Sequence, residues 1–325
     1  MDQTWTRTLE TSTAPTILDE IGIERHLLSP SVQRAMIKSG RLRGSLFLPT
    51  AATAHNQAPG VIDLYGTAGG LMEQRAALLS AHGFAVLALA YFDYDDLPDS
   101  VGQVDLTYFD EAVDWLTSQS EIVSDRVGVV GLSLGSDIAL MMAINNPKVS
   151  ASVAINGGHM LDPFCPLQFR GEPLPFAQFD PSDDFNMPES DVFVYRQLRK
   201  RLMPNEEAIF KIENAKTARF LLVASGDDHS TPSDVSMKIL YDRCPQRSEL
   251  LKYENAGHLL EPPFMPFCGV SFHPFIGGLS GWGGEAVSHE RAQEDFWRRL
   301  RQFLTENVGM PISMTNDDCV SLSKL

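Results

Sequence analysis

The stretch from Val127 to Ala143 constrains the fold of this chain more than any other. It begins as a valine-rich strand, continues through a Gly-Leu-Ser-Leu-Gly turn, and ends in a segment typical of a helix. A serine at such a corner projects its hydroxyl outward, and the residues two positions before and after it must be small because the strand and helix backbones nearly collide there. The helix N-terminus also supplies N–H groups that suit an oxyanion. The stretch therefore predicts a strand–turn–helix corner with Ser133 as a candidate nucleophile, a plain glycine-rich turn being the alternative.

Apolar strands and amphipathic helices alternate on both sides of this corner. The predicted strands are 41–49, 60–65, 84–90, 127–130, 149–155, 220–224 and 250–253, and the predicted helices besides the one after Ser133 are 71–82, 103–118, 235–241 and 290–305. Near-continuous apolar strands indicate an α/β fold with a mostly parallel sheet flanked by helices on both faces. The alternation breaks between about 156 and 217, which predicts a lid-like, partly helical insertion over the site.

Composition excludes several classes of partner and cofactor. The formal net charge of −16 argues against nucleic acid or an anionic membrane as a partner. No apolar run is long enough to span a bilayer. The 4 cysteines are scattered without paired spacing, which predicts free thiols and neither a disulfide framework nor a zinc site. We expect no metal and no cofactor, because histidine and cysteine lack ligand spacing.

A serine nucleophile needs a histidine base that a carboxylate orients, and in doubly wound hydrolases the chain order is serine, acid, histidine. The loop after strand 220–224 carries Asp227 and Asp228, and the loop after strand 250–253 carries His258. His258 is the predicted general base, and one of the two aspartates is its predicted partner. His229 competes as the base, but it shares the loop of the acid, so we expect it to make local hydrogen bonds.

The oxyanion of an acyl-transfer intermediate needs two N–H donors aimed at one point. One is expected from Leu134, directly after the nucleophile. The other is expected from the glycine-rich loop 66–70, which follows a strand predicted beside the nucleophile strand, and Thr67 is the best single candidate. A nucleotide-type phosphate loop is the alternative, but the Gly-x-Gly-x-x-Gly spacing is lacking.

The printed sequence ends in Ser323-Lys324-Leu325, which matches a peroxisomal address read by an import receptor. The preceding residues, 309–322, are polar and lack a helical pattern. We therefore expect a flexible tail over 309–325 that presents this signal, and a peroxisomal location.

Several stretches resemble the catalytic domain of the type-I acyl-CoA thioesterases, a family that includes bile acid-CoA:amino acid N-acyltransferase. The resembling stretches are Pro59 to Pro98, Ala154 to Gly157, Gly171 to Pro175, Gly226 to His229, Gly257 to Pro263 and Trp282 to Glu285. The resemblance covers about residues 24–308, and it implies an α/β-hydrolase fold, fatty acyl-CoA substrates and a triad of Ser133, Asp228 and His258.

The chain departs from this family in two places. Members usually carry a β-sandwich domain before the hydrolase domain, whereas here we expect only an N-terminal extension over 1–23. At the serine turn, Leu134 and Ser136-Asp137 stand where the family commonly has Lys and Gly-Glu. The second departure points to a different acyl specificity or to another ester as substrate.

The leading functional hypothesis is hydrolysis of an acyl-CoA to a free acid and CoA through an acyl-enzyme on Ser133. Transfer of the acyl group to an amino acid is one alternative, although the resembling transferases typically use cysteine as the nucleophile. A carboxylester or lactone hydrolase in a peroxisomal biosynthetic route is another, and a non-catalytic binding module is a third. The basic stretch with Arg196, Arg199, Lys200 and Arg201 could hold the CoA phosphates, or it could be a solvated helix face.

Overall fold

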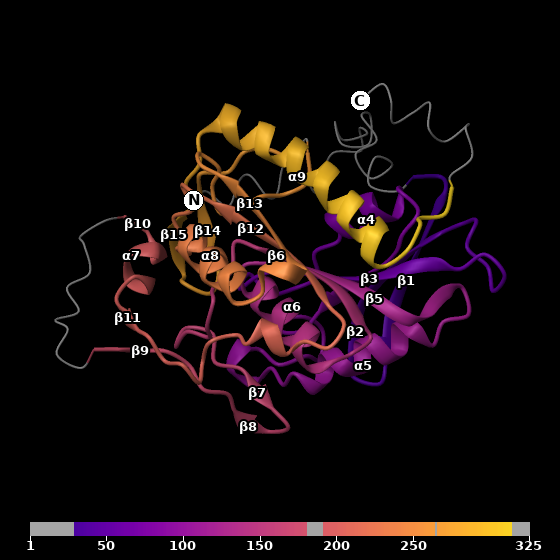
Figure 1. Ribbon diagram of the computed structural model, residues 1–325, viewed down its shortest axis with the longest axis horizontal. Coiled ribbons are helices and arrows are strands. Elements are labelled where there is room, and N and C mark those ends of the chain that lie inside the picture. Colours follow the sequence, from indigo (N-terminus) through magenta and orange to yellow (C-terminus); the bar gives the residue numbers. More distant parts are fainter. Residues whose placement is uncertain (1–28, 181–190, 264, 314–325) are drawn as a thin grey trace, which may run out of the picture.

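The computed structural model describes residues 29–180, 191–263 and 265–313. The central sheet has 8 strands in the order β1-β2-β4-β3-β5-β6-β12-β13 (Figure 1). Its strands are β1 (Val32–Ser39), β2 (Leu42–Pro49), β3 (Ala58–Leu64), β4 (Ala85–Ala90), β5 (Ile122–Leu132), β6 (Val149–Ile155), β12 (Arg219–Ser225) and β13 (Ser248–Tyr253). The pairs β1–β2 and β2–β4 are antiparallel, and all the others are parallel. The prediction of a mostly parallel sheet is confirmed.

Helices cover both faces of this sheet. They are α4 (Gln74–Ser80), α5 (Thr107–Thr117), α6 (Leu134–Asn145), α8 (Ser233–Arg243) and α9 (Ala286–Asn307). Buried side chains of α5, α6 and α8 form one core cluster with one face of the sheet, and those of α4 and α9 form a second cluster with the other face. Strand β5 contributes to both: Val127 and Val129 belong to the first cluster, and Val130 and Leu132 to the second. Alternate residues of a strand face opposite sides, so an almost uniformly apolar strand is what a doubly covered sheet requires.

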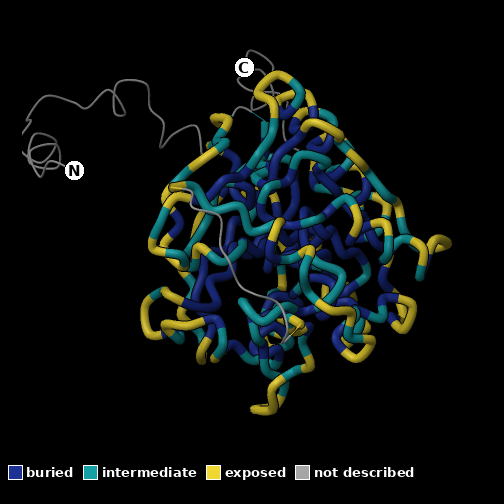
Figure 2. Tube along the Cα trace, turned by 90° about the vertical axis from the view of Figure 1, so that its left-hand side faces the viewer, coloured by how far each residue is buried: buried dark blue, intermediate teal, exposed yellow. Residues whose placement is uncertain are grey.

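Burial follows this layering. The inner strands of the sheet lie inside the molecule, whereas the edge strand β1 is mostly exposed and many other exposed residues lie in the loops (Figure 2). Among the described residues, no helix has the length and apolar character needed to cross a membrane.

The region predicted as an insertion leaves the sheet after β6 and returns at β12. It contains α7 (Tyr195–Arg199) and short strands, namely β7 (Gln168–Phe169), β8 (Glu172–Pro173), β9 (Gln178–Phe179), β10 (Val192–Phe193) and β11 (Leu202–Met203). Its residues Gly157 to Met160 border the same recess as Ser133, so the expected position over the site is confirmed.

Several predicted boundaries shift, and some elements were not predicted. Helix α4 begins at Gln74, not Leu71, and α5 begins at Thr107 after a 3-10 turn at Val101–Gln103. Other 3-10 turns occur at Ile212–Asn214 and Pro245–Arg247. The unpredicted elements include the short strands of the insertion, the edge strand β1 and a hairpin of β14 (Val270–His273) and β15 (Gly278–Gly281). The expected extension 1–23 and the signal Ser323-Lys324-Leu325 lie outside the described residues.

Candidate active site

Ser133 stands at the corner between β5 and α6, as predicted. Its backbone has φ 59° and ψ −124°, a conformation that non-glycine residues rarely adopt. A Cβ on Gly131 would collide with the backbone of Gly135, and a Cβ on Gly135 would lie 2.6 Å from the carbonyl oxygen of Leu64. Both flanking glycines are therefore required by the close approach of strand and helix, and the geometry holds the serine at the carboxyl end of β5.

A buried carboxylate–imidazole pair lies on the loops after β12 and β13. The Nδ1 atom of His258 is 2.9 Å from Oδ2 of Asp228 and 3.0 Å from its Oδ1. Asp228 Oδ1 also accepts from the backbone N–H groups of Ser230 and Thr231, both at 2.8 Å, and its Oδ2 accepts from the Ser233 hydroxyl at 2.9 Å. Every one of these partners can donate a hydrogen bond, so the site is built for an ionised carboxylate.

The structure distinguishes the two neighbouring aspartates. Asp228 is fully buried, whereas the side chain of Asp227 is 47% exposed and contacts Nε2 of His229 at 3.1 Å. The second oxygen of Asp227 accepts from the backbone of Gly284 at 2.8 Å. His229 is thus engaged locally, as expected, and Asp228 is the aspartate that contacts His258.

Three further residues hold this site together, and sequence reasoning gave none of them a role. The Trp282 ring stacks on the His258 ring, with 5.6 Å between the ring centroids and an interplanar angle of 15°. The backbone carbonyl oxygen of Trp282 also accepts a hydrogen bond from the backbone N–H of His258. Asn156 donates from Nδ2 to the His258 carbonyl oxygen at 2.8 Å. His273, on β14, contacts the hydroxyl of Thr67 at 3.1 Å. Trp282 and Asn156 belong to stretches that resemble the family, which is the signal that could have identified them.

The two predicted oxyanion donors follow the carboxyl ends of adjacent strands. Strand β3, which precedes the glycine loop, pairs with β5, which precedes the serine. The loop lies against the nucleophile, because a Cβ on Gly66 would be 3.3 Å from the Ser133 hydroxyl oxygen. Within the described parts of the chain, the N–H groups of Leu134 and Thr67 donate to no other group. Both are therefore available to a ligand.

Two arginines of the basic stretch brace the loop that carries the acid. Arg196 donates to the carbonyl oxygen of Asp228 at 3.0 Å and pairs with Asp234 at 2.9 Å. Arg199 pairs with Asp162 at 2.6 Å and donates to the hydroxyl of Thr231 at 3.0 Å. Lys200 is exposed and Arg201 is partly buried. Phosphate binding by this stretch stays a prediction, and the structure adds a positioning role for Arg196 and Arg199.

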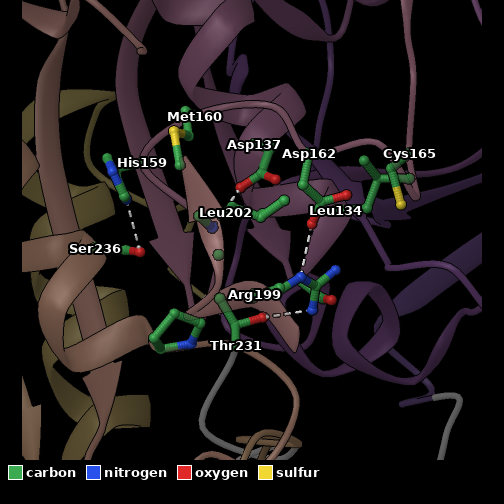
Figure 3. Close-up of a pocket in the computed structure, with 14 residues that line it drawn as sticks. Leu134, Asp137, His159, Met160, Asp162, Cys165, Arg199, Leu202, Thr231 and Ser236 are labelled. Carbon is green, nitrogen blue, oxygen red and sulfur yellow. Dashed lines mark hydrogen bonds and ion pairs between the residues drawn. The ribbon is translucent and has the colours of Figure 1, made fainter. Parts of the chain in front are cut away.

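A recess opens beside Ser133 between α6 and the insertion (Figure 3). Its cavity volume is about 30 Å³ as the side chains stand, and about 460 Å³ when the open solvent at its mouth is included. Asp137, one turn along α6, stands on its wall, where burial and then the nearby Asp162 carboxylate raise the pKa of Asp137 to about 8. Among the described residues, no group of three or more His, Cys, Asp or Glu side chains could hold a metal ion.

Comparison with solved structures shows the α/β-hydrolase fold. An esterase from Pyrococcus furiosus matches with a TM-score of 0.52 and 14% identity, over 86% of this chain and 93% of the other. Esterase 2 of Thermogutta terrifontis matches with a TM-score of 0.52 and 12% identity, over 88% of this chain and 98% of the other. Residues 20–168 also match a family described as PET hydrolase-like.

Comparison with characterised proteins gives much higher identities. The mouse (Mus musculus) bile acid-CoA:amino acid N-acyltransferase is 37% identical over 90% of this chain and 69% of its own length. Human (Homo sapiens) acyl-coenzyme A thioesterase 1 is 35% identical over 90% of this chain and 70% of its own length. Mouse peroxisomal succinyl-coenzyme A thioesterase is 35% identical over 88% of this chain and 68% of its own length.

Residues 104–310 match the family described as the C-terminal domain of BAAT and acyl-CoA thioester hydrolases. This match covers the serine corner, the acid loop and the histidine loop. The match and the identities agree with the resemblance stated from the sequence. The chain belongs to the BAAT / acyl-CoA thioester hydrolase family.

Proposed function

We propose that this chain is a serine hydrolase that cleaves acyl-CoA thioesters to a free carboxylic acid and CoA. The observation that carries the proposal is the buried Asp228–His258 pair at the same edge of the sheet as the Ser133 corner. The order of the strands supports the proposal, because β5, β12 and β13 are parallel and the carboxyl ends of parallel strands meet at one edge of a sheet. Family membership supports the choice of acyl-CoA, since relatives are named as acyl-coenzyme A thioesterases.

The residues provide a group for each step of this reaction. Asp228 fixes the His258 ring so that Nδ1 carries a proton and Nε2 is free to accept one. In the proposed reaction, Ser133 Oγ attacks the thioester carbonyl carbon while its proton passes to His258. The oxyanion that forms accepts hydrogen bonds from Leu134 and Thr67 N–H groups. The C–S bond then breaks, CoA leaves with the proton from His258, and an acyl-serine ester remains.

Water completes the cycle by the same groups in reverse roles. His258 takes a proton from water, and the resulting hydroxide attacks the acyl carbon of the ester. The C–O bond to Ser133 breaks, the serine recovers its proton from the imidazolium, and the carboxylic acid leaves. No step of the proposed reaction involves a metal ion.

Replacing Ser133 with alanine tests the assignment. We expect hydrolysis of hexanoyl-CoA, followed by release of free thiol, to fall by at least about 10⁴-fold, the scale on which loss of a triad member acts. Binding of the uncleaved ester to the variant, measured by calorimetry, should persist. Thioesterase activity within tenfold of wild type would disprove the proposal.

Acyl transfer to an amino acid is the second candidate, because relatives include mouse N-acyltransferases at 36–37% identity, among them acyl-coenzyme A amino acid N-acyltransferase 2 at 36%. Serine at position 133 favours water as the acceptor. Product analysis with and without glycine or taurine separates the two reactions. An N-acyl amino acid as the main product would assign the protein as a transferase. Hydrolysis of simple aryl esters without hydrolysis of acyl-CoA would instead indicate a carboxylester hydrolase.

For location we propose the peroxisome. Support comes from the tripeptide Ser323-Lys324-Leu325 and from a relative that is named as peroxisomal. A fluorescent protein fused in front of the chain should colocalise with a peroxisomal marker and become diffuse when the tripeptide is deleted. Diffuse fluorescence of the intact fusion would contradict this location.

A further inference from the structure

The recess beside Ser133 has one wall that is more polar than an alkyl chain requires. Its apolar contributors include Leu134, Met160 and Leu202, and its polar ones include Asp137, His159, Asp162, Arg199, Thr231 and Ser236 (Figure 3). A fatty acyl chain gains most from a continuous apolar lining, because burial of CH₂ groups is what stabilises it. The polar wall therefore needs a different explanation.

Most of these polar groups already bond to one another. His159 contacts the Ser236 hydroxyl at 3.0 Å, and Arg199 bonds to Asp162 and Thr231 (Figure 3). These pairs satisfy Arg199, Asp162, Thr231 and Ser236 without a ligand. Within the described residues, the Nε2 atom of His159 and one carboxyl oxygen of Asp137 have no hydrogen-bond partner, and Asp137 is the one that stands on the same helix as Ser133.

Asp137 lies on α6 four residues after Ser133, which places its backbone about 6 Å further along the helix axis. Its Oδ1 accepts from the N–H of Gly158 at 2.8 Å. Within the described parts of the chain, its Oδ2 has no hydrogen-bond partner. A ligand that filled the recess with carbon alone would remove this oxygen from water and leave it without a hydrogen bond, which is unfavourable.

The charge of the recess selects among polar ligands. The carboxylate of Asp162 disfavours a carboxylate on the ligand, and the guanidinium of Arg199 is already paired with Asp162. Burial raises the pKa of Asp137 to about 8, so this carboxyl is mostly neutral at pH 7 and does not call for a cation. The titratable groups around Asp137 are Asp162, Arg199, His159, Cys165 and Tyr91. An uncharged group that both donates and accepts is the best complement.

We infer that the recess receives an acyl group bearing a hydroxyl, and that this hydroxyl bonds to the Asp137 carboxyl. The inference rests on the proposed hydrolysis of acyl-CoA and specifies its acyl part. Asp137 becomes a specificity-determining residue, and hydroxyacyl-CoA esters become the preferred substrates. A hydroxyl suits Asp137 in either protonation state, because it accepts from the neutral acid and donates to the carboxylate.

The test compares hexanoyl-CoA with 3-hydroxyhexanoyl-CoA and 5-hydroxyhexanoyl-CoA. We expect wild-type kcat/KM to be about 2–10-fold higher for at least one hydroxylated ester, the range that a neutral hydrogen bond supplies. Asp137→Leu should bring that ratio to one or below, and Asp137→Asn, which keeps a neutral donor and acceptor, should retain it. Asp114→Asn on α5, whose side chain is 71% exposed, is the matched control and should leave the ratio unchanged.

Two results would overturn the inference: a wild-type ratio at or below one for both hydroxylated esters, or an unchanged ratio in Asp137→Leu. If Asp137→Leu does not fold, as judged by circular dichroism, Asp137→Ala makes the same comparison with a smaller side chain. Binding of the three esters to Ser133→Ala, measured by calorimetry, reports on the recess without turnover. If wild type cleaves none of the esters, the proposed function is wrong, and the binding preference of Ser133→Ala still decides the role of Asp137.

Discussion

Asparagine at position 228 should nearly abolish catalysis while leaving the fold in place. The Oδ1 atom of Asp228 accepts from two backbone N–H groups, those of Ser230 and Thr231. Neither can accept a hydrogen bond, so the amide oxygen of asparagine must take that position. Its NH₂ group then occupies the Oδ2 position, beside the Ser233 hydroxyl and 2.9 Å from Nδ1 of His258, while the amide oxygen keeps only the longer 3.0 Å contact with Nδ1.

This reversal changes the tautomer of the base. The hydroxyl can turn to accept from the amide, but His258 can accept only if Nδ1 gives up its proton, which then resides on Nε2. An imidazole protonated on Nε2 cannot take the proton of Ser133. A wrong tautomer lowers kcat by about 10⁴ in a serine triad, which corresponds to about 5 kcal/mol of transition-state stabilisation.

The neighbouring aspartate provides the matched control. Asp227 is half exposed, and its partners are His229 and the Gly284 backbone. We expect Asp227→Asn to keep hexanoyl-CoA hydrolysis within about threefold of wild type, since an exposed surface contact contributes at most about 1 kcal/mol. The assay is kcat from thiol release at saturating ester, with circular dichroism to verify folding. More than about 1% of wild-type kcat in Asp228→Asn, or an equal loss in Asp227→Asn, would refute this reasoning.

Two further predictions concern stability. Gly131→Ala forces a Cβ into the backbone of Gly135, so we expect the free energy of unfolding in urea to fall by about 1–3 kcal/mol, and an unchanged urea midpoint would contradict the proposed close packing. Burial, and then the charge of Arg301, lower the pKa of His82 to about 4. In the unfolded chain His82 binds a proton near pH 6.5, whereas in the folded chain it binds one only near pH 4. The stability that is present above pH 6.5 is therefore lost progressively as the pH falls from 6.5 to about 4. In His82→Gln the free energy of unfolding should fall less between pH 7 and 4.5 than in the wild type, by up to about 3 kcal/mol. If the urea midpoints of both proteins depend on pH in the same way, the prediction is wrong.

The sequence was sufficient for the parts of this fold that repeat a local rule. Apolar strands such as Phe220 to Ala224 could be found because burial on both faces leaves a continuous apolar run. The edge strand β1 escaped prediction because most of its residues are exposed and it pairs with β2 alone, which leaves no apolar pattern to read. The hairpin β14–β15 is similar, with Val270, Phe272 and Leu279 exposed.

The candidate site shows the same division. Ser133 could be identified because its corner imposes glycines at fixed spacing. The choice between Asp227 and Asp228 could not be made from residue chemistry, because it depends on which side chain points inward, and only the family resemblance selected Asp228. The stacking of Trp282 on His258 joins residues 24 positions apart through the strand β15, and no local pattern reports such a contact.

The bracing of the acid loop by α7 has a consequence for how this enzyme can diversify. Arg199 borders the recess beside Ser133, and its neighbour Arg196 donates to the backbone carbonyl oxygen of Asp228. A substitution that reshapes the recess from this helix therefore also disturbs the orientation of the catalytic acid. Variants that change acyl preference by substitutions on α7 should therefore lose catalytic rate. New specificities should arise more readily from substitutions on the opposite wall, on α6, where Asp137 stands apart from the acid loop.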